Sequence, residues 1–316
     1  MPLAQDMNIN QLITGFARRY NNEEFLAERI LPPVPVTKLI GKYARYDKDN
    51  LRTKNLKRLS GARGRAPVVD YGVDNATYSC EIYRLAGMVD STENSQADAP
   101  FQPEADTTAN VQDLMSIAKE KDMVDQVFAS GNFASGNKTA LAASTYWDAA
   151  AATGPAGPVK QVLSARSVVL TKVLRKPNLM VVGETTHTTL LTAKDITERL
   201  KFVQAITVAG VENALASIFG VSEYLVEKAV ENTAVEGDTD SLSLLVADKA
   251  ILLVRPTVQS TKTVAHSVQF RQNQFPNGDM WNQREEMGTK YIEVRDAYDM
   301  TTVDSSAGYI FVNTNA

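Results

Sequence analysis

The spacing of apolar residues predicts several different helices and strands and no internal repeat. Residues 107–130 carry the longest helical pattern, because apolar side chains recur there every three or four positions. A helix of that length would extend about 35 Å at about 1.5 Å per residue. Asp106 or Thr107 could cap its start, and Gly131 could end it. We therefore expect a long spine helix in this part of the chain.

A compact unit of mixed helices and strands is predicted behind the spine helix. Residues 134–158 are rich in Gly, Ala, Ser, Thr and Pro and indicate a linker. Helical spacing at residues 161–175 then ends before Pro177, and the apolar run at 179–182 is typical of a buried strand. Further helices and strands are expected at residues 185–191, 196–203, 211–219, 224–226 and 250–254.

The remaining segments favour extended structure. The sequence LPPVPV at residues 31–36 cannot continue a helix, because proline lacks an N–H and disfavours helix in the residue before it. Residues 42–86 contain five tyrosines among β-branched neighbours, with Gly61 and Gly64 between them, which indicates two long strands joined by a flexible tip. Such a hairpin has little apolar content, and two isolated strands are marginal in water. We expect it to lie on another surface.

The predicted fold class is α+β, in five parts. They are an amino-terminal arm (1–41), the hairpin (42–86), a region around the spine helix (87–160), the mixed unit (161–266), and strands that return to the region of the spine (267–316).

Charge is divided unevenly along the chain. The 316 residues carry 33 Lys and Arg against 37 Asp and Glu, a formal net charge of −4. Residues 38–65 alone hold ten basic and two acidic side chains, so the rest of the chain sums to −12. Residues 90–106 hold five acidic side chains and no basic one. A basic segment is therefore followed closely by an acidic one.

Three interpretations of the basic segment stay open at this point: solvated charge, docking to an acidic protein surface, or binding of nucleic acid. Basic side chains can bind phosphates through counterion release, but residues 51–65 contain no aromatic residue on which a base could stack. For docking, the candidate contact residues are Lys42, Arg45, Lys48, Arg52, Lys54, Lys57, Arg58, Arg63 and Arg65. Their candidate acidic counter-charges are Asp90, Glu93, Asp98, Glu104 and Asp106.

The sequence offers few residues for catalysis. One cysteine, Cys80, and two histidines, His187 and His266, cannot supply a zinc cluster or a convincing Cys/His pair. The segment from Gly131 to Thr139 resembles a phosphate-binding loop, but it has one residue too many before Lys138 and it follows a predicted helix instead of a strand. We expect no catalytic residue, metal or cofactor; a nucleotide-binding enzyme is the alternative that this loop would support.

The composition favours a soluble protein of a reducing compartment. A lone cysteine forms no internal disulfide. The first residues lack the features of a signal peptide, and no stretch approaches the roughly 18 consecutive apolar residues of a membrane span.

The order of these segments resembles the major capsid proteins of tailed bacteriophages, which have the Hong Kong 97 capsid fold. Five segments carry the resemblance: FLAERILPPVPV (25–36), the return strand of the hairpin (71–83), DAPF (98–101), KPNLMVVG (176–183) and SSAGYIFV (305–312). They occur in the same order as in that family and span nearly the whole chain.

The resemblance implies a shell subunit that forms pentamers and hexamers of an icosahedral shell around double-stranded DNA. Residues 42–86 would be the E-loop that lies across the P domain of a neighbouring subunit, and residues 161–266 would be the A domain. A separate scaffold, a portal and cement proteins are implied partners, and the virion, assembled in the host bacterial cytoplasm, is the implied location. An encapsulin, a cellular nanocompartment with the same fold, is the alternative.

Overall fold

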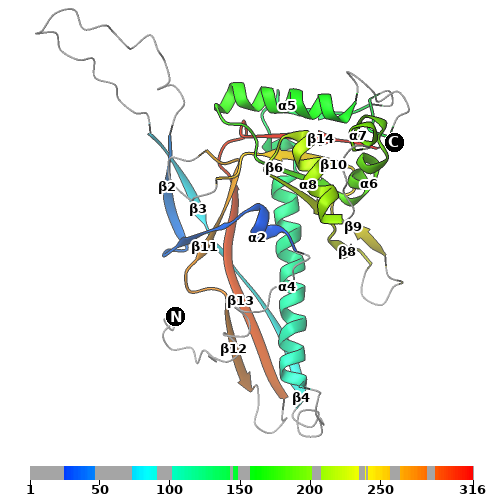
Figure 1. The fold of residues 1–316 in the computed structure, drawn as a ribbon. Coiled ribbons are helices and arrows are strands. Elements are labelled where there is room, and N and C mark those ends of the chain that lie inside the picture. Colours follow the sequence, from blue (N-terminus) through cyan, green and yellow to red (C-terminus); the bar gives the residue numbers. More distant parts are fainter. Residues whose placement is uncertain are drawn as a thin grey trace, which may run out of the picture.

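Two sheets, a long helix and a projecting ribbon make up the fold (Figure 1). The computed structural model describes residues 25–46, 73–90, 102–142, 145–148, 157–200, 208–234, 239, 241–256, 264–282 and 289–315. The first sheet is built around the long strand β13 (Thr289–Thr302). Strands β11 (Ser267–Gln272) and β12 (Asn277–Asn282) pair antiparallel with successive stretches of β13, and β4 (Glu81–Asp90) pairs antiparallel with its residues 289–298.

The amino-terminal segment joins this sheet directly. After the short helix α2 (Ala27–Ile30), strand β1 (Pro33–Val36) pairs parallel with β11. The extended conformation predicted for residues 31–36 is confirmed, and the pairing explains how prolines are tolerated there. Proline is restricted to edge strands because it cannot donate to the ladder, and β1 lies at the end of the strand order.

The projecting ribbon consists of β2 (Ile40–Tyr46) and β3 (Val73–Ser79), which pair antiparallel from Ile40↔Ser79 to Tyr46↔Val73. It leaves the body beside β11 (Figure 1). The predicted hairpin over residues 42–86 therefore includes too much of the return strand. From residue 81 onward the chain belongs to the sheet around β13, and Cys80 separates the two strands.

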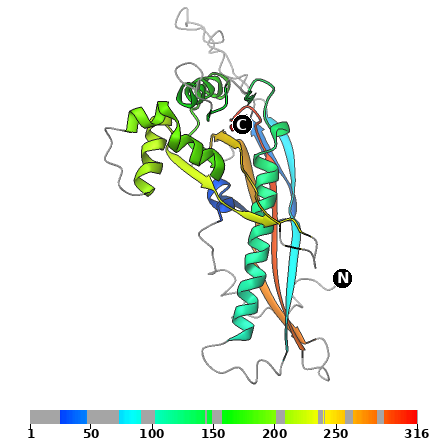
Figure 2. The ribbon, with the colours of Figure 1, turned by 90° about the vertical axis from the view of Figure 1, so that its right-hand side faces the viewer.

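The spine helix α4 (Pro103–Val127) packs along β13 and β4, and Figures 1 and 2 both show it running the length of the sheet. It begins four residues before the predicted start, because proline is well accommodated in the first helical turn, where its missing N–H needs no partner. Neither Asp106 nor Thr107 caps the helix, whose N-cap is Gln102. Gly87 of β4 allows the close approach, since a Cβ there would lie 2.4 Å from a methyl group of Thr107.

The second sheet has the order β5-β14-β10-β6-β7. Its strands are β5 (Lys138–Ala140), β6 (Leu179–Gly183), β7 (Glu223–Glu227), β10 (Lys249–Leu253) and β14 (Gly308–Val312). Helices α5 (Pro158–Val173), α6 (Glu184–Thr192), α7 (Lys194–Leu200) and α8 (Val208–Phe219) accompany it, and β8 (Val230–Asn232) pairs with β9 (Leu242–Leu244) beside it. We call these elements the α/β lobe.

Both faces of the central strands β6 and β10 are buried, in keeping with the unbroken apolar runs that predicted them. Alternate residues of β6 point to opposite sides. Met180 and Val182 join a core with α5 and α8, whereas Leu179 and Val181 join a second core that includes α2 and the carboxyl end of α4. The α/β lobe is thereby fixed to the spine helix.

One predicted strand lies in a different sheet from the one expected. Residues 308–312 were expected to return to the region of the spine, but β14 pairs with β10 and β5 in the α/β lobe. Likewise, β5 belongs to this lobe although residues 87–160 were assigned to the spine region. The apolar pattern identifies a strand without identifying its partner.

Among the described residues, no helix has the length and apolar character that crossing a membrane would require.

Candidate assembly interface

The ribbon meets the body through aromatic side chains. The ring of Tyr78 stacks on Phe270 of β11 with 4.7 Å between centroids, and the ring of Tyr43 lies 5.1 Å from Phe270 at a tilt. The thiol of Cys80 donates to the carbonyl of Phe270 at 3.7 Å. Ile40, at the base of the ribbon, is 70% exposed. The ribbon is therefore anchored at its root and has no core of its own, as the sequence predicted.

Two of the nine basic contact candidates lie in the described part of the ribbon. Lys42 and Arg45 are exposed on β2. The other seven lie outside the described residues: Lys48, Arg52, Lys54, Lys57, Arg58, Arg63 and Arg65.

The described acidic candidates belong to the end of β4 and the first turn of α4, which lie at the opposite end of the first sheet from the ribbon (Figure 1). Asp90 ends β4, and Asp106 is exposed in the first turn of α4. Glu104 accepts a hydrogen bond from Lys290 at 2.7 Å, so it already has a partner in its own chain. Glu93 and Asp98 lie outside the described residues. Within one chain, the described basic and acidic candidates do not meet.

A second acidic surface, which the sequence did not reveal, lies at the root of the ribbon. A hollow of about 310 Å³ is lined by carboxylates from β4, α4 and β13. We call it the acidic hollow; its four carboxylates belong to Glu81, Asp122, Asp125 and Asp299. No ion pair with a basic side chain of the described residues engages any of the four.

The carboxylates of the acidic hollow help to raise the pKa values of two neighbouring groups, Tyr83 and Cys80. Burial, with the nearby carboxylates of Asp122, Glu81 and Asp299, raises the pKa of Tyr83. Burial and Asp299 raise the pKa of Cys80 to about 11. Both groups stay neutral at physiological pH. Residues from three distant parts of the chain form it, and no local pattern could have predicted it.

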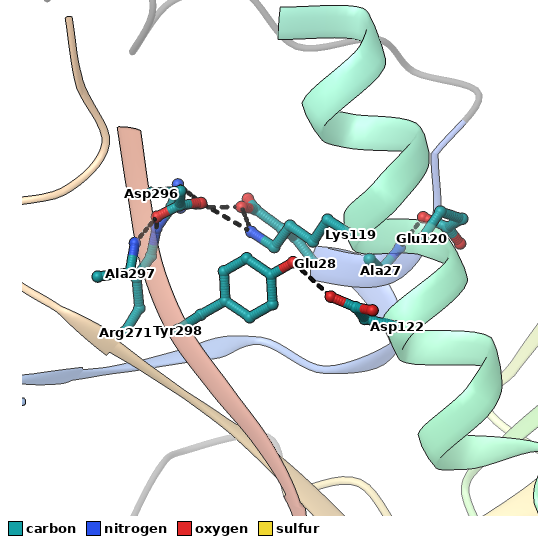
Figure 3. Close-up of polar contacts among 9 residues, drawn as sticks. All are labelled: Ala27, Glu28, Lys119, Glu120, Asp122, Arg271, Asp296, Ala297 and Tyr298. Atoms are coloured by element: carbon teal, nitrogen blue, oxygen red, sulfur yellow. Dashed lines mark hydrogen bonds and ion pairs between the residues drawn. The ribbon is translucent and has the colours of Figure 1, made fainter. Parts of the chain in front are cut away.

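A charged cluster connects the amino-terminal segment, the spine helix and the first sheet (Figure 3); its members Lys119 and Asp296 are buried, whereas Glu28 is exposed. Lys119 of α4 binds Glu28 at 2.7 Å and lies 3.6 Å from Asp296 of β13. Arg271 of β11 binds Asp296 through two nitrogens, at 2.9 and 2.7 Å, and binds Glu28 at 2.9 Å. Four charges of alternating sign thus connect four elements, α2, α4, β11 and β13, and removing one charge would leave Lys119 or Asp296 buried with too little compensation.

The cluster extends along the spine helix through Tyr298, which stacks on Tyr83 with centroids 4.6 Å apart and donates to Asp122 at 2.8 Å. Burial acts to raise the pKa of Glu28, but the charges and hydrogen bonds of Lys119 and Arg271 outweigh burial and lower that pKa. Apolar character alone does not identify the buried face of α4, because Leu114 is 50% exposed while Lys119 is buried. The charged partners, far away in sequence, decide which face of α4 is inside.

Two further carboxyl groups are fully buried between the spine helix and the α/β lobe. Glu120 of α4 is 0% exposed and Glu227 of β7 is 1% exposed. Glu120 accepts a hydrogen bond from the backbone N–H of Ala27 at 2.8 Å (Figure 3). Burial, together with the proximity of Glu227, raises the pKa of Glu120 to about 9.

The residues considered for chemistry occupy structural positions. His266 is 1% exposed and stacks on Phe133, and burial lowers its pKa to about 4. His187 shares a hydrogen bond of 3.0 Å with the hydroxyl of Tyr224. The segment from Gly131 to Thr139 follows α4 and leads into β5, so the order is helix, loop, strand, the reverse of a phosphate-binding loop. Groups of three or more metal-ligating side chains are absent from the part of the chain that the structure describes.

Comparison with known proteins identifies relatives among viral shells. The chain is 27% identical over 225 residues to the major capsid protein of Burkholderia phage BcepMu, covering 70% of this chain and 69% of that protein. It is 28% identical over 182 residues to the major capsid protein of Pseudomonas phage JBD67, covering 58% of this chain and 56% of that protein. No family model matches the chain.

Solved structures share the fold over almost the whole chain. A phage-related protein of Bordetella bronchiseptica RB50 has a TM-score of 0.74 at 19% identity, covering 97% of both chains. The capsid structure of cyanophage P-SCSP1u has a TM-score of 0.58 at 7% identity, covering 91% of this chain and 87% of that chain. The SrpI encapsulin complex of Synechococcus elongatus has a TM-score of 0.53 at 13% identity, covering 94% and 89%. The predicted α+β capsid fold is confirmed.

Proposed function

Because the chain belongs to the major capsid proteins of tailed bacteriophages, we propose that copies of it form the pentamers and hexamers of an icosahedral shell around double-stranded DNA. The chain's own partner would be a second copy of itself. Separate scaffolding and portal proteins, and cement proteins on the outside, are the other partners that this function implies. Assembly would take place in the host bacterial cytoplasm, and the protein would end in the virion.

The projecting ribbon is the observation that carries the proposal. Strands β2 and β3 pair with each other, contact the body at their root, and present exposed Lys42 and Arg45. Two paired strands gain too little from each other to be stable in water. A surface of a neighbouring subunit would supply the missing contacts, as the E-loop does in this fold.

We propose further that the basic loop docks on acidic surface of the neighbour. Two acidic surfaces are available: the segment from Asp90 to Asp106, predicted from sequence, and the acidic hollow. The hollow is the stronger candidate, because Glu104 in the first is already bound to Lys290 whereas the carboxylates of the hollow have no basic partner among the described residues. Exposed ion pairs contribute about 0.2 to 1 kcal/mol each. The contact would therefore set register and orientation more than affinity.

The decisive experiment is electron microscopy of the full chain after expression and purification. We expect closed shells from the wild type. Reversing the three basic residues together (Lys54→Glu, Lys57→Glu and Arg58→Glu) should leave folded subunits that assemble poorly at low salt. A control with three exposed lysines of the α/β lobe reversed (Lys160→Glu, Lys176→Glu and Lys194→Glu) should assemble normally.

Two results would contradict the proposal. Wild-type chain that stays monomeric in the presence of its scaffolding protein would remove the shell function. Normal shells from the loop variant at every salt concentration would remove the electrostatic docking while leaving the shell function intact. The contents of shells purified from the natural host distinguish a phage capsid protein from an encapsulin. We expect double-stranded DNA inside the shells, whereas a cargo enzyme would indicate an encapsulin.

A further inference from the structure

Three elements meet at the buried carboxyl groups of Glu120 and Glu227. Glu120 comes from the spine helix, Glu227 ends β7 of the α/β lobe, and the N–H of Ala27 comes from the first turn of α2. The amino-terminal segment, the spine and the lobe are thus joined at one polar point inside an otherwise apolar core. We call this point the carboxyl junction.

Two of the four carboxyl oxygens at the carboxyl junction accept hydrogen bonds from backbone N–H groups. One oxygen of Glu120, Oε2, accepts from the N–H of Ala27 at 2.8 Å, and Oε1 of Glu227 accepts from the N–H of Ala229 at 3.0 Å. The remaining oxygens, Oε1 of Glu120 and Oε2 of Glu227, are buried and find no donor among the described residues. The two carboxyl groups are nevertheless close enough to hydrogen-bond to each other. Two carboxylates have no hydrogen to share, so that bond requires a proton on one of them.

Basic side chains do not compensate the two carboxyl groups. On α4, Lys119 binds Glu28 and Asp296, and Lys121 binds Glu231 of β8. On α2, Arg29 binds Glu223, the residue that begins β7. After β7, Lys228 is exposed. The neighbouring acidic side chains Glu28, Glu223 and Glu231 are engaged in these pairs, so within the described part of the chain no ion pair joins Glu120 or Glu227 to a cation.

We propose that Glu120 and Glu227 share a single proton in the folded chain, and that this proton holds the spine helix, the amino-terminal segment and the α/β lobe together. Two like charges in contact inside a core cannot both persist. Loss of the proton would leave two negative charges in contact inside the core, and the core would have to open to water to solvate these charges. The junction is then a latch that alkaline conditions release. It is a property of the subunit itself and does not depend on shell formation.

Glutamine provides the matched test, because it is isosteric with the protonated acid and cannot ionise. In Glu120→Gln, the amide oxygen can still accept from Ala27 and the amide N–H can donate to Glu227. We expect the thermal midpoint of the wild type to fall by roughly 5 °C or more between about pH 6 and about pH 10. Over the same pH range, the thermal midpoint of the double variant Glu120→Gln/Glu227→Gln should fall by less than half as much as that of the wild type. Glu198→Gln, an exposed position on α7, should behave like the wild type.

A direct observation of the proton is available in the wild type, so the test does not depend on whether the variants fold. Infrared difference spectroscopy distinguishes the carbonyl stretch of a protonated carboxylic acid from carboxylate bands. At neutral pH we expect a protonated carboxylic acid band that disappears in Glu120→Gln/Glu227→Gln and at alkaline pH. A wild type without this band at neutral pH overturns the proposal. So does a double variant whose thermal midpoint falls with pH as steeply as that of the wild type.

Discussion

Tyr78 on β3 stacks on Phe270 on β11 with 4.7 Å between ring centroids, and this contact is where the projecting ribbon joins the body. The direction of the ribbon depends on it, because the ribbon has no core. Tyr43 contacts the same phenylalanine from the other strand, at 5.1 Å. A single side chain of the body therefore positions both strands of the ribbon.

Replacing Phe270 by alanine tests whether this side chain positions the ribbon. Phe270 is 6% exposed, and buried Phe→Ala changes cost about 3 to 5 kcal/mol. We expect urea denaturation to show a loss of that order and electron microscopy to show few closed shells. Phe270→Leu keeps most of the buried area but loses the aromatic contacts, which contribute about 0.5 to 1.5 kcal/mol. Equal shell yields from the alanine variant and the wild type would show that the ribbon is positioned by something else.

Breaking the charged cluster at its buried member Asp296 should be far more costly than breaking an exposed pair. Asp296→Asn removes the charge that faces both Lys119 and Arg271, which leaves two cations with too little compensation. We expect the free energy of unfolding to fall by about 3 kcal/mol. Asp195→Asn breaks the exposed pair with Arg199 on α7 and should change stability by less than about 0.5 kcal/mol. Similar losses in the two variants, measured by urea denaturation, would contradict a structural role for the cluster.

The acidic hollow offers a test by charge exchange. Converting Asp122 and Asp125 to lysine should impair assembly of the full chain, since the basic loop of a neighbour would meet like charge. Combining these changes with Lys54→Glu, Lys57→Glu and Arg58→Glu should restore part of the shell yield. Restoration, measured by sedimentation, is expected only if the loop and the hollow meet. A combined variant that assembles worse than either parent would locate the docking surface elsewhere.

His266 should make the chain sensitive to acid. Burial holds its pKa at about 4, below the ordinary value of 6.5, so the unfolded chain binds a proton more readily than the folded chain. The unfolding free energy should therefore fall as the pH drops from about 6.5 towards about 4, by up to about 1.4 kcal/mol per pH unit. Urea titrations of His266→Gln over the same range should lack this contribution. An unchanged slope would mean that His266 is not the titrating group.

A glycine of the second sheet should not tolerate a methyl group. A Cβ on Gly183 would lie 2.4 and 2.5 Å from the backbone oxygens of Ala247 and Val246, neither of which can move as a side chain would. Gly183→Ala should lower the unfolding free energy by about 1 to 3 kcal/mol, the usual cost of overpacking. Gly131→Ala has no neighbour within 4 Å of the new atom and is the control. Equal thermal midpoints for the two variants would contradict this reading of the packing.

Local pattern was sufficient for the elements that bury apolar residues on their own. Strands β6 and β10 were predicted because both their faces are buried, so their runs are apolar throughout. Strands β11 and β12 lie within the segment 267–316 that was predicted to hold return strands, but no apolar pattern marked them individually, because polar residues such as Gln269 and Asn277 are buried through pairing with β13. The long helix was predicted, but its buried face was not. Lys119 and Glu120 are inside because Glu28, Asp296 and Ala27 satisfy them, and these partners lie far along the chain.

The candidate interface, too, could be predicted only in part from the sequence. The basic side was visible as a run of charge at residues 38–65, since its members are close in sequence. The acidic hollow draws on β4, α4 and β13, and only the fold brings Glu81, Asp122 and Asp299 to one place.

The position of β14 also bears on how the chain is made. Residues 308–312 pair with β10 on one side and with β5 on the other, and β5 has no other strand beside it in the described sheet. A ribosome delivers β5, β6, β7 and β10 well before it delivers β14. The α/β lobe therefore cannot close before β14 has been made, and a chain that still lacks β14 presents no finished lobe to a growing particle. Only chains that already include β14 can bring a closed α/β lobe to the shell.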